Sequence, residues 1–170
     1  MRRLSLARGD HPSHALRRSM ADKLTPEKRS ANMARIRSKD TKPEVAVRQL
    51  AHALGYRFRL HRKDLPGKPD LVFPSRKAVI FVHGCFWHQH ELAACLDGRR
   101  PKSNNSYWEA KLDRNIARDS LAQAELTKSG WRALVVWECE TKNKERLQET
   151  LMAFLGPSAS RQATRRTAKA

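Results

Sequence analysis

The side chains best suited to chemistry in this chain gather where an apolar segment ends. Residues 78 to 90 read AVIFVHGCFWHQH, and the apolar run up to Val82 is typical of a buried strand. From His83 onward the segment holds three histidines, one cysteine and two aromatic residues. An exposed pair such as Phe86 and Trp87 costs solubility unless something covers it. We therefore expect this segment to bind a ligand, a metal ion or both.

A carboxylate precedes this segment in the sequence. The residues GKPD at positions 67 to 70 are typical of a turn that delivers Asp70 to the start of another short strand. A carboxylate and imidazoles at neighbouring strand ends can hold a divalent cation and a water molecule, as phosphodiester hydrolysis requires. Considered alone, Asp70 is better explained as a turn residue that caps a loop.

The charge balance indicates a polyanionic partner. The chain has 35 Lys and Arg against 17 Asp and Glu, a net charge of +18. Positions 1 to 30 contribute +5 and positions 156 to 170 contribute +4, which leaves +9 on the residues between them. The body of the chain is therefore basic, and nucleic acid is the leading candidate partner. A membrane surface is disfavoured because the basic residues do not line one face of an apolar helix.

The length of 170 residues suits one domain with loose ends. We expect a basic, disordered extension at residues 1–24, a folded domain at 25–155 and a basic, disordered tail at 156–170. No segment has the pattern of a secretory signal or a membrane span, so we expect a cytoplasmic protein. Three cysteines in a reducing compartment favour metal ligation or burial over a disulfide.

Hydrophobic periodicity predicts an α/β domain with helices around one mixed sheet. Thr25 and Pro26 can start a short helix, and Thr41 can cap a firmer one that ends near Gly55. We expect strands at about 56–60, 70–73, 78–82 and 131–139, and helices at 107–129 and 144–155. The apolar stripe of the long helix is expected to consist of Trp108, Leu112, Ile116 and Leu121.

Several short motifs together resemble one enzyme family. They are RSANM at 29–33, SKDTKPE at 38–44, PGKPD at 66–70, FVHGCFWH at 81–88 and VVWEC at 135–139. In order and spacing they are similar to those of the very-short-patch repair (Vsr) endonucleases over roughly residues 25 to 155. The resemblance implies a fold like that of the restriction endonucleases, with a central mixed sheet flanked by helices. It also implies an enzyme that nicks DNA beside the thymine of a T·G mismatch left by deamination of 5-methylcytosine.

The resemblance also implies roles for the polar residues. Asp70 and the backbone carbonyl of Val82 would hold a catalytic Mg²⁺, with valine here where the family has threonine. His88 would be the general base, an imidazole whose pKa near neutrality suits that task. His83 and Glu44 would lie behind the direct metal ligands or contact the metal through water, and Asp119 would be an acidic residue near the site. Glu44 is also explained as a first-turn carboxylate and Asp119 as part of a solvated helix face.

The cysteines match the family's structural zinc site. The implied ligands are Cys85, His90, Cys95 and Cys139, a closed set of three thiolates and one imidazole. The family has a cysteine two residues after the histidine, whereas this chain reaches Cys95 only after Glu91 to Ala94, a loop three residues longer. The spacing of Cys85 and His88 offers a rival ligand pair, and three buried free thiols are a further alternative.

The aromatic residues match a wedge that the family inserts beside the mismatch. The implied wedge consists of Phe86, Trp87 and Trp108, with Met33 acting from the other side of the duplex. Unstacking costs a few kcal/mol per step and is recovered through contacts with the distorted DNA. Trp108 is also in register with Leu112, so it can instead begin the core stripe of its helix.

The function expected from the resemblance is therefore Mg²⁺-dependent nicking of double-stranded DNA at T·G mismatches by a zinc-containing monomer in the bacterial cytoplasm. Accessory proteins of mismatch repair are possible partners. Two alternatives remain open. One is a DNA-binding protein that keeps the structural zinc but has lost catalytic activity. The other is a sequence-specific endonuclease that cuts both strands, as restriction enzymes do.

Overall fold

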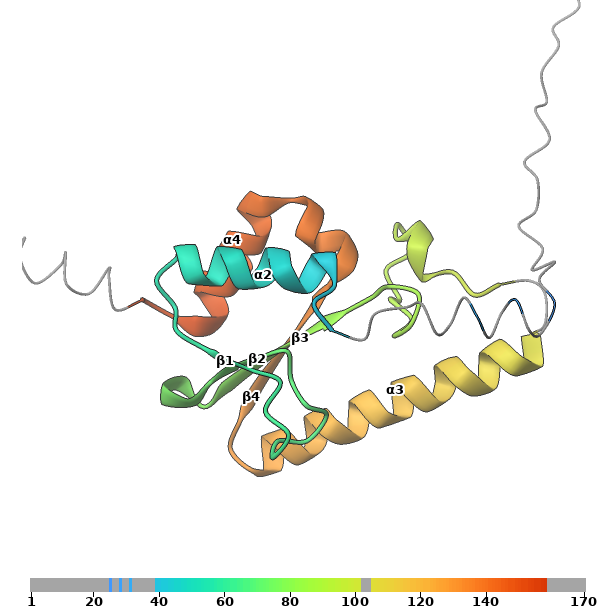
Figure 1. Cartoon of the computed structure of the whole chain (residues 1–170), viewed down its shortest axis with the longest axis horizontal. Coiled ribbons are helices and arrows are strands. Elements are labelled where there is room, and N and C mark those ends of the chain that lie inside the picture. The colour runs from blue at the N-terminus through green and yellow to red at the C-terminus, as the bar shows by residue number, and fades with distance from the viewer. Residues whose placement is uncertain (1–24, 26–27, 29–30, 32–38, 102–104, 159–170) are drawn as a thin grey trace, which may run out of the picture.

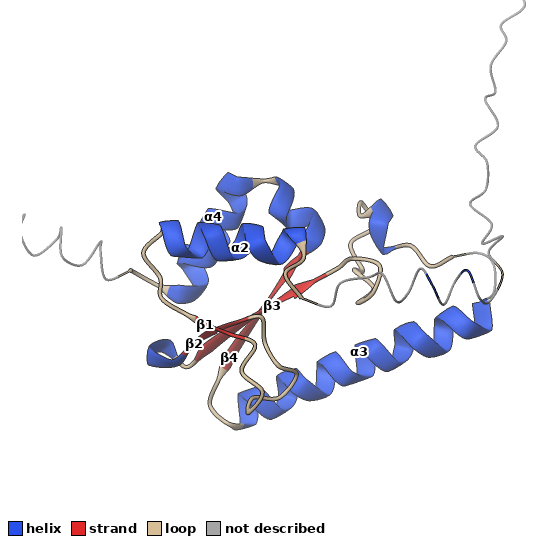
Figure 2. Cartoon of the chain, in the orientation of Figure 1, coloured by secondary structure: helices blue, strands red, loops and turns tan. Residues whose placement is uncertain are grey.

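A four-stranded mixed sheet forms the centre of the domain, with helices on both sides (Figures 1 and 2). The computed structural model describes residues 25, 28, 31, 39–101 and 105–158. The sheet order is β1-β2-β3-β4, formed by Arg59–Leu60, Leu71–Phe73, Ala78–His83 and Arg132–Trp137. β1 and β2 are antiparallel, β2 and β3 are antiparallel, and β3 and β4 are parallel. The expected mixed sheet flanked by helices is confirmed, and the likeness to restriction endonucleases stays a prediction.

Three long helices cover the sheet. They are α2 (Lys42–Ala53), α3 (Asn105–Lys128) and α4 (Lys144–Leu155). Helices α2 and α4 lie together on one face, and α3 crosses the opposite face (Figure 1). Short 3₁₀ helices lie at Pro74–Arg76, Leu96–Gly98 and Glu138–Lys142. Within the described residues, no helix is both long enough and apolar enough to span a membrane.

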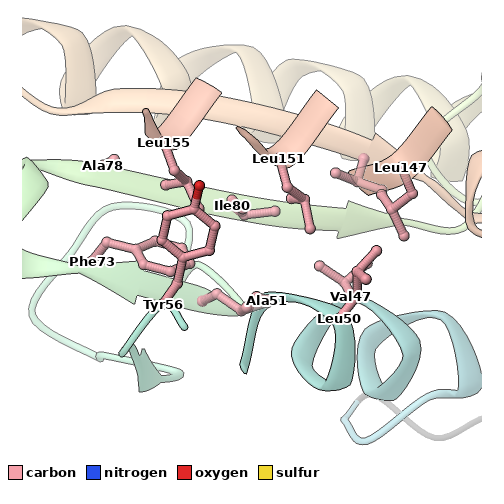
Figure 3. Close-up of a cluster of buried hydrophobic side chains, with 12 residues drawn as sticks. Val47, Leu50, Ala51, Tyr56, Phe73, Ala78, Ile80, Leu147, Leu151 and Leu155 are labelled. Atoms are coloured by element: carbon pink, nitrogen blue, oxygen red, sulfur yellow. The ribbon is translucent and has the colours of Figure 1, made fainter. Parts of the chain in front are cut away.

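The two faces of the sheet bury separate apolar clusters. The larger cluster joins α2 and α4 to the sheet through residues such as Val47, Ile80 and Leu151, all with no exposed surface (Figure 3). The smaller cluster, Val72, Val79, Phe81 and Leu126, lies beneath α3. Alternate residues of β2 and β3 point to opposite faces, so β2 and residues 78–82 of β3 are all apolar, and His83 ends β3. This double burial holds the end of β3 rigidly between the helices.

Local capping sets the ends of the two shorter helices. The Thr41 hydroxyl oxygen accepts the Glu44 N–H at 3.4 Å, and Gly55 after α2 has φ +86°. The Asn143 side chain accepts the Arg146 N–H at 2.8 Å and begins α4. The predicted bounds of α4 are confirmed. The short helix expected from Thr25 lies mostly outside the described residues, as do the N-terminal extension and nearly all of the C-terminal tail.

The first strand is shorter than the alternation of Tyr56, Phe58 and Leu60 predicts. Only Arg59 and Leu60 pair with β2. Tyr56 instead turns into the core at 3% exposure, and its hydroxyl donates to the Gly156 carbonyl at 2.6 Å. Burial of an aromatic ring against the helices therefore replaces strand pairing here.

The long helix buries a different face from the predicted stripe. Trp108 and Leu112 are buried as expected, but Ile116 is 37% exposed and Leu121 is 61% exposed. The inward face continues instead through Asn115, Asp119, Ala122 and Leu126, at the spacing of one helical side. The prediction was wrong for Ile116 and Leu121 because it continued an apolar pattern through positions where the inward face is polar.

Candidate functional site

The end of β3 and the turn after it contribute to two neighbouring clusters of polar side chains. β3 ends at His83, and the Gly84 carbonyl accepts the His88 N–H at 3.2 Å in the following turn. The Cys85 carbonyl then accepts the His90 N–H at 3.0 Å. These two hydrogen bonds close a compact turn over residues 84–90. His83 and His88 face a cleft, while Cys85 and His90 belong to a thiol cluster.

The cleft has a volume of about 630 Å³ and lies between the sheet end and α3. Its lining includes Asp70, His83, His88 and Asp119. Four of the five residues expected to serve catalysis therefore lie in one concavity. The fifth, Glu44, is buried at 4% exposure beside this cleft.

Asp70 lies immediately before β2 and contacts the neighbouring strand. Its Oδ2 accepts the backbone N–H of Val82 at 2.7 Å. The N–H and C=O of one strand residue point to the same side, so the Val82 carbonyl faces the side of β3 on which Asp70 lies. Burial raises the pKa of Asp70 to about 6, against the opposing effect of the Val82 hydrogen bond. A half-buried carboxylate beside a carbonyl oxygen suits a hard cation such as Mg²⁺.

His83, His88 and Asp119 form a second group across the cleft. The imidazoles of His83 and His88 stack with ring centroids 3.8 Å apart. His88 Nδ1 hydrogen-bonds to Asp119 Oδ2. An ionised carboxylate only accepts, so Nδ1 carries the proton and Nε2 is left with a lone pair. Burial, followed by the proximity of His88, lowers the pKa of His83 to about 4 and keeps that ring neutral.

Basic side chains border the same cleft. Lys39, Lys63, Lys68 and Arg118 contribute to its lining. The loop that carries Lys63 and Lys68 lies directly on α3, because a Cβ at Gly67 would be 2.8 Å from the Ala122 Cβ. Gly67 also has φ +70°, which glycine adopts without strain. This close approach keeps the ammonium groups of Lys63 and Lys68 at the cleft, where they suit a polyanionic substrate.

Glu44 belongs to a charged network at the start of α2. Its Oε2 accepts from Arg48 Nη2 at 2.7 Å and from the Asp40 N–H at 3.0 Å. Arg48 Nη2 also lies 2.9 Å from His61 Nε2. Glu44 is thus both a first-turn carboxylate of α2 and a neighbour of the cleft, since His61 contributes to the cleft lining.

The thiol cluster contains Cys85, His90, Cys95 and Cys139. One ligand atom from each of the four residues lies within 4.8 Å of the others. His90 Nδ1 is 3.4 Å from Cys139 Sγ and 3.8 Å from Cys85 Sγ. The longer loop before Cys95 still delivers this thiol to the cluster. His88 lies on the cleft side instead, where Asp119 holds it.

The aromatic residues pack into one cluster beside the turn. The ring of Phe86 lies 4.9 Å from that of Trp87 and 5.3 Å from that of Trp108, measured between centroids. Phe86 and Trp87 are half-buried, whereas Trp108 is only 6% exposed. Trp108 therefore lies beneath the other two in this conformation. Met33 lies outside the described residues.

Comparison with known proteins identifies the family. A family model described as DNA mismatch endonuclease Vsr matches residues 21–94. The type II nicking enzyme V.XorIIP of Xanthomonas oryzae pv. oryzae is 54% identical over 139 residues, covering 82% of this chain and 100% of that protein. The type II nicking enzyme V.NmeAIP of Neisseria meningitidis is 46% identical over 132 residues, covering 78% of this chain and 92% of that protein. The DNA mismatch endonuclease Vsr of Escherichia coli is 38% identical over 130 residues, covering 76% and 81%.

This chain belongs to the Vsr family. The family resemblance carried by the sequence motifs is confirmed, and as a Vsr endonuclease the protein is a DNA-cleaving hydrolase. The basic residues of the cleft agree with a DNA substrate.

Sequence reasoning about this Vsr protein missed His61, which lines the cleft, and two residues that contact the site, Arg48 and Asn115. Arg48 and His61 had no motif to mark them, because their contacts with Glu44 and Asp70 depend on the fold. Asn115, whose Nδ2 donates to the Trp87 carbonyl at 2.9 Å, could have been found. Asn115 and Asp119 interrupt the inward face of a helix, and a polar residue at such a position indicates a partner or a site.

Proposed function

We propose that this Vsr endonuclease nicks one strand of double-stranded DNA beside the thymine of a T·G mismatch, with Mg²⁺ bound at Asp70. The observation that carries the proposal is the cleft that joins a half-buried carboxylate, a His–Asp pair and four basic side chains. Family membership and the names of the relatives as nicking enzymes support strand nicking. The T·G preference and the metal are the parts of this proposal that require experiment.

Asp70 and the Val82 carbonyl would hold the cation, since both offer hard oxygen ligands. Bound Mg²⁺ would stabilise the charge that develops on the phosphate and lower the pKa of a bound water molecule. Glu44 would act at a distance from the cation, because Arg48 already occupies one of its carboxylate oxygens.

His88 is the proposed general base. Its Nε2 lone pair would take the proton of the attacking water, and Asp119 would stabilise the imidazolium that results. A neutral His83 stacked on His88 adds no like charge to oppose this step. Asp119 would thus orient His88, and His88 would activate the water, as in other sites where a third side chain orients the general base.

Lys39, Lys63, Lys68 and Arg118 would bind phosphates that flank the cleaved bond. Phe86 and Trp87 would stack beside the mismatch, with Trp108 supporting them from below. The thiol cluster would hold Zn²⁺, because three thiols and one imidazole are the ligands of a closed structural site. We propose a monomer in the bacterial cytoplasm, folded over residues 25–155, that can act with accessory proteins of mismatch repair.

A cleavage assay tests this function. One duplex is prepared with T·G, T·A or C·G at a single position, and nicking of each strand is followed with and without Mg²⁺. The proposal expects one nick, on the thymine strand of the T·G duplex alone. Cleavage of both strands of matched DNA would instead identify a restriction-like enzyme, and binding without cleavage would identify an inactive DNA-binding protein.

Asp70→Ala provides the matched test of the metal ligand. We expect nicking to fall by at least about 1000-fold, equivalent to about 4 kcal/mol of transition-state stabilisation. Affinity for the T·G duplex should stay within a few fold, because the carboxylate serves the reaction more than the DNA contact. Full activity in Asp70→Ala would refute the assignment.

A further inference from the structure

A second layer of side chains reaches Asp70 from α2 and from the end of β1. Arg48 is 13% exposed at its side chain and lies between Glu44 and His61. The His61 ring continues towards the cleft, where its Nδ1 lies 3.8 Å from Asp70 Oδ1. A chain of contacts thus runs from Glu44 through Arg48 and His61 to Asp70.

Hydrogen-bond chemistry determines where the His61 proton lies. A guanidinium has only donors, so His61 Nε2, at 2.9 Å from Arg48 Nη2, must be the acceptor. This contact places the proton of the His61 ring on Nδ1, the atom that faces Asp70. The distance of 3.8 Å exceeds a direct hydrogen bond, and a small rotation of the ring would close it.

The backbone of His61 supports a specific role. His61 has φ +46°, in the left-handed region that non-glycine residues adopt at a cost. This conformation follows directly after β1 and directs the chain from the sheet edge towards the cleft. Such strain persists where surrounding contacts hold it, here the bond from Arg48.

The same neighbourhood also offers a possible metal set, Asp40, Glu44 and His61, whose ligand atoms lie within 4.8 Å of one another. Arg48 already contacts all three of these residues. A guanidinium and a metal cation would compete for the same lone pairs, so this group is better explained as an organised support than as a cation site.

We propose that His61 is a positioning residue for Asp70, held by Arg48 so that its Nδ1–H orients the Asp70 carboxylate towards the catalytic cation. The inference rests on the proposed function, which makes Asp70 the metal ligand. Groups that orient a metal-binding carboxylate contribute about 10- to 100-fold in metal affinity or activity.

The tautomer of His61 is testable in the full-length protein without catalysis. Nitrogen-15 NMR of the imidazole rings, with His61→Asn to assign the His61 signals, reports which nitrogen carries the proton. The proposal expects a proton on Nδ1, which faces Asp70, and none on Nε2, which accepts from Arg48. A ring protonated on Nε2, or on both nitrogens, would overturn it.

Metal titration tests the effect on Asp70. The amide nitrogen of Asn takes nearly the place of His Nδ1, and Asn tolerates a left-handed backbone. We expect His61→Ala to raise the Mg²⁺ concentration at half-maximal nicking, and the Mn²⁺ dissociation constant measured by calorimetry, by about 10-fold or more. His61→Asn should stay within about 3-fold of the parent, because it retains the donor towards Asp70.

The controls separate this inference from the proposed function. His52→Ala removes an exposed histidine in the last turn of α2, away from the cleft, and should leave both metal measurements unchanged. Unaltered metal dependence in His61→Ala, while Asp70→Ala is inactive, would overturn the role of His61 alone. Activity in Asp70→Ala would overturn the proposed function itself.

Discussion

The cleft and the thiol cluster draw their side chains from the same turn but differ in architecture. The cleft takes His83 and His88, and the thiol cluster takes Cys85 and His90. The thiol cluster is closed, since Cys95 completes it from further along the same loop and Cys139 from the segment after β4. The cleft is open, with Asp70, His88 and Asp119 about one-fifth exposed at their side chains.

Residues 83 to 90 therefore contribute both to a cluster suited to stabilising the fold and to a cleft suited to catalysis. Four soft or borderline ligands with no open position suit a metal that fastens segments together. Hard oxygen ligands and an imidazole with a free lone pair suit a cation and a water that react. Because one turn serves both clusters, a change on one side tests whether the other depends on it. The following predictions are ordered from the largest expected effect to the smallest.

Cys139→Ser should remove the metal of the thiol cluster and destabilise the whole domain. Structural zinc contributes about 10 to 16 kcal/mol of binding free energy in small domains, so loss of one thiolate should lower the free energy of unfolding by more than about 5 kcal/mol. Elemental analysis should find about one zinc in the parent and almost none in the variant, and calorimetry should find the lower melting temperature. Active parent protein that contains no zinc would contradict a structural zinc site at the thiol cluster.

His88→Ala should affect only the cleft. We expect the nicking rate to fall by about 100- to 10,000-fold, the contribution of a general base, while zinc content and melting temperature stay unchanged. Single-turnover kinetics and elemental analysis measure the two sides independently. Loss of zinc from His88→Ala would move this histidine into the thiol cluster and leave the cleft without its proposed base.

Asp70→Asn should stabilise the metal-free protein in a pH-dependent way. The pKa of Asp70 is raised from 3.8 to about 6, so the folded state is favoured with the carboxyl protonated. Below pH 3.8 the carboxyl is protonated in both the folded and the unfolded state, and the folded protein has its full stability. As pH rises, the unfolded state ionises first and the free energy of unfolding falls, until above about pH 6 the loss is complete.

A neutral amide avoids that loss, so Asp70→Asn should exceed the parent by about 2 to 3 kcal/mol in free energy of unfolding at pH 8. The advantage should shrink at pH 5. Added Mg²⁺ should raise the melting temperature of the parent only. An equal effect of pH on both proteins would show that Asp70 is not destabilised by burial.

Trp87→Ala tests the residues between the two clusters. If Trp87 stacks beside the mismatch, its loss should raise the dissociation constant for T·G duplex by about 5- to 150-fold, or 1 to 3 kcal/mol. The melting temperature should change little, because Trp87 is half-buried.

Trp108→Ala is the matched control in the same aromatic cluster. Trp108 is 6% exposed, so its truncation should cost about 3 to 5 kcal/mol of folding stability. A stable Trp108→Ala variant with weak T·G binding would assign the wedge to Trp108 as well. Undiminished T·G preference in Trp87→Ala would remove Trp87 from the wedge.

Much of the site could be predicted because its residues are chemically distinctive and close in sequence. Asp70, His83 and the three cysteines stand in motifs that few structural roles explain, and the structure brings them to the end of one strand. The contacts of Arg48 with His61 could not be predicted, since they join α2 to the residue after a two-residue strand.

The sequence by itself determined where the helices begin and which His, Cys and Asp side chains are available as metal ligands. Caps such as Thr41 and Asn143 act within one turn, so local chemistry decides where α2 and α4 begin. Only the tertiary structure decided between the two ligand pairs that the sequence left open, Cys85 with His90 and Cys85 with His88. Asp119, 31 residues from His88, holds that ring on the cleft side through a hydrogen bond, and His90 lies among the thiols. The inward face of α3 was decided in the same way, because burial depends on what lies opposite a helix and not on its own pattern alone.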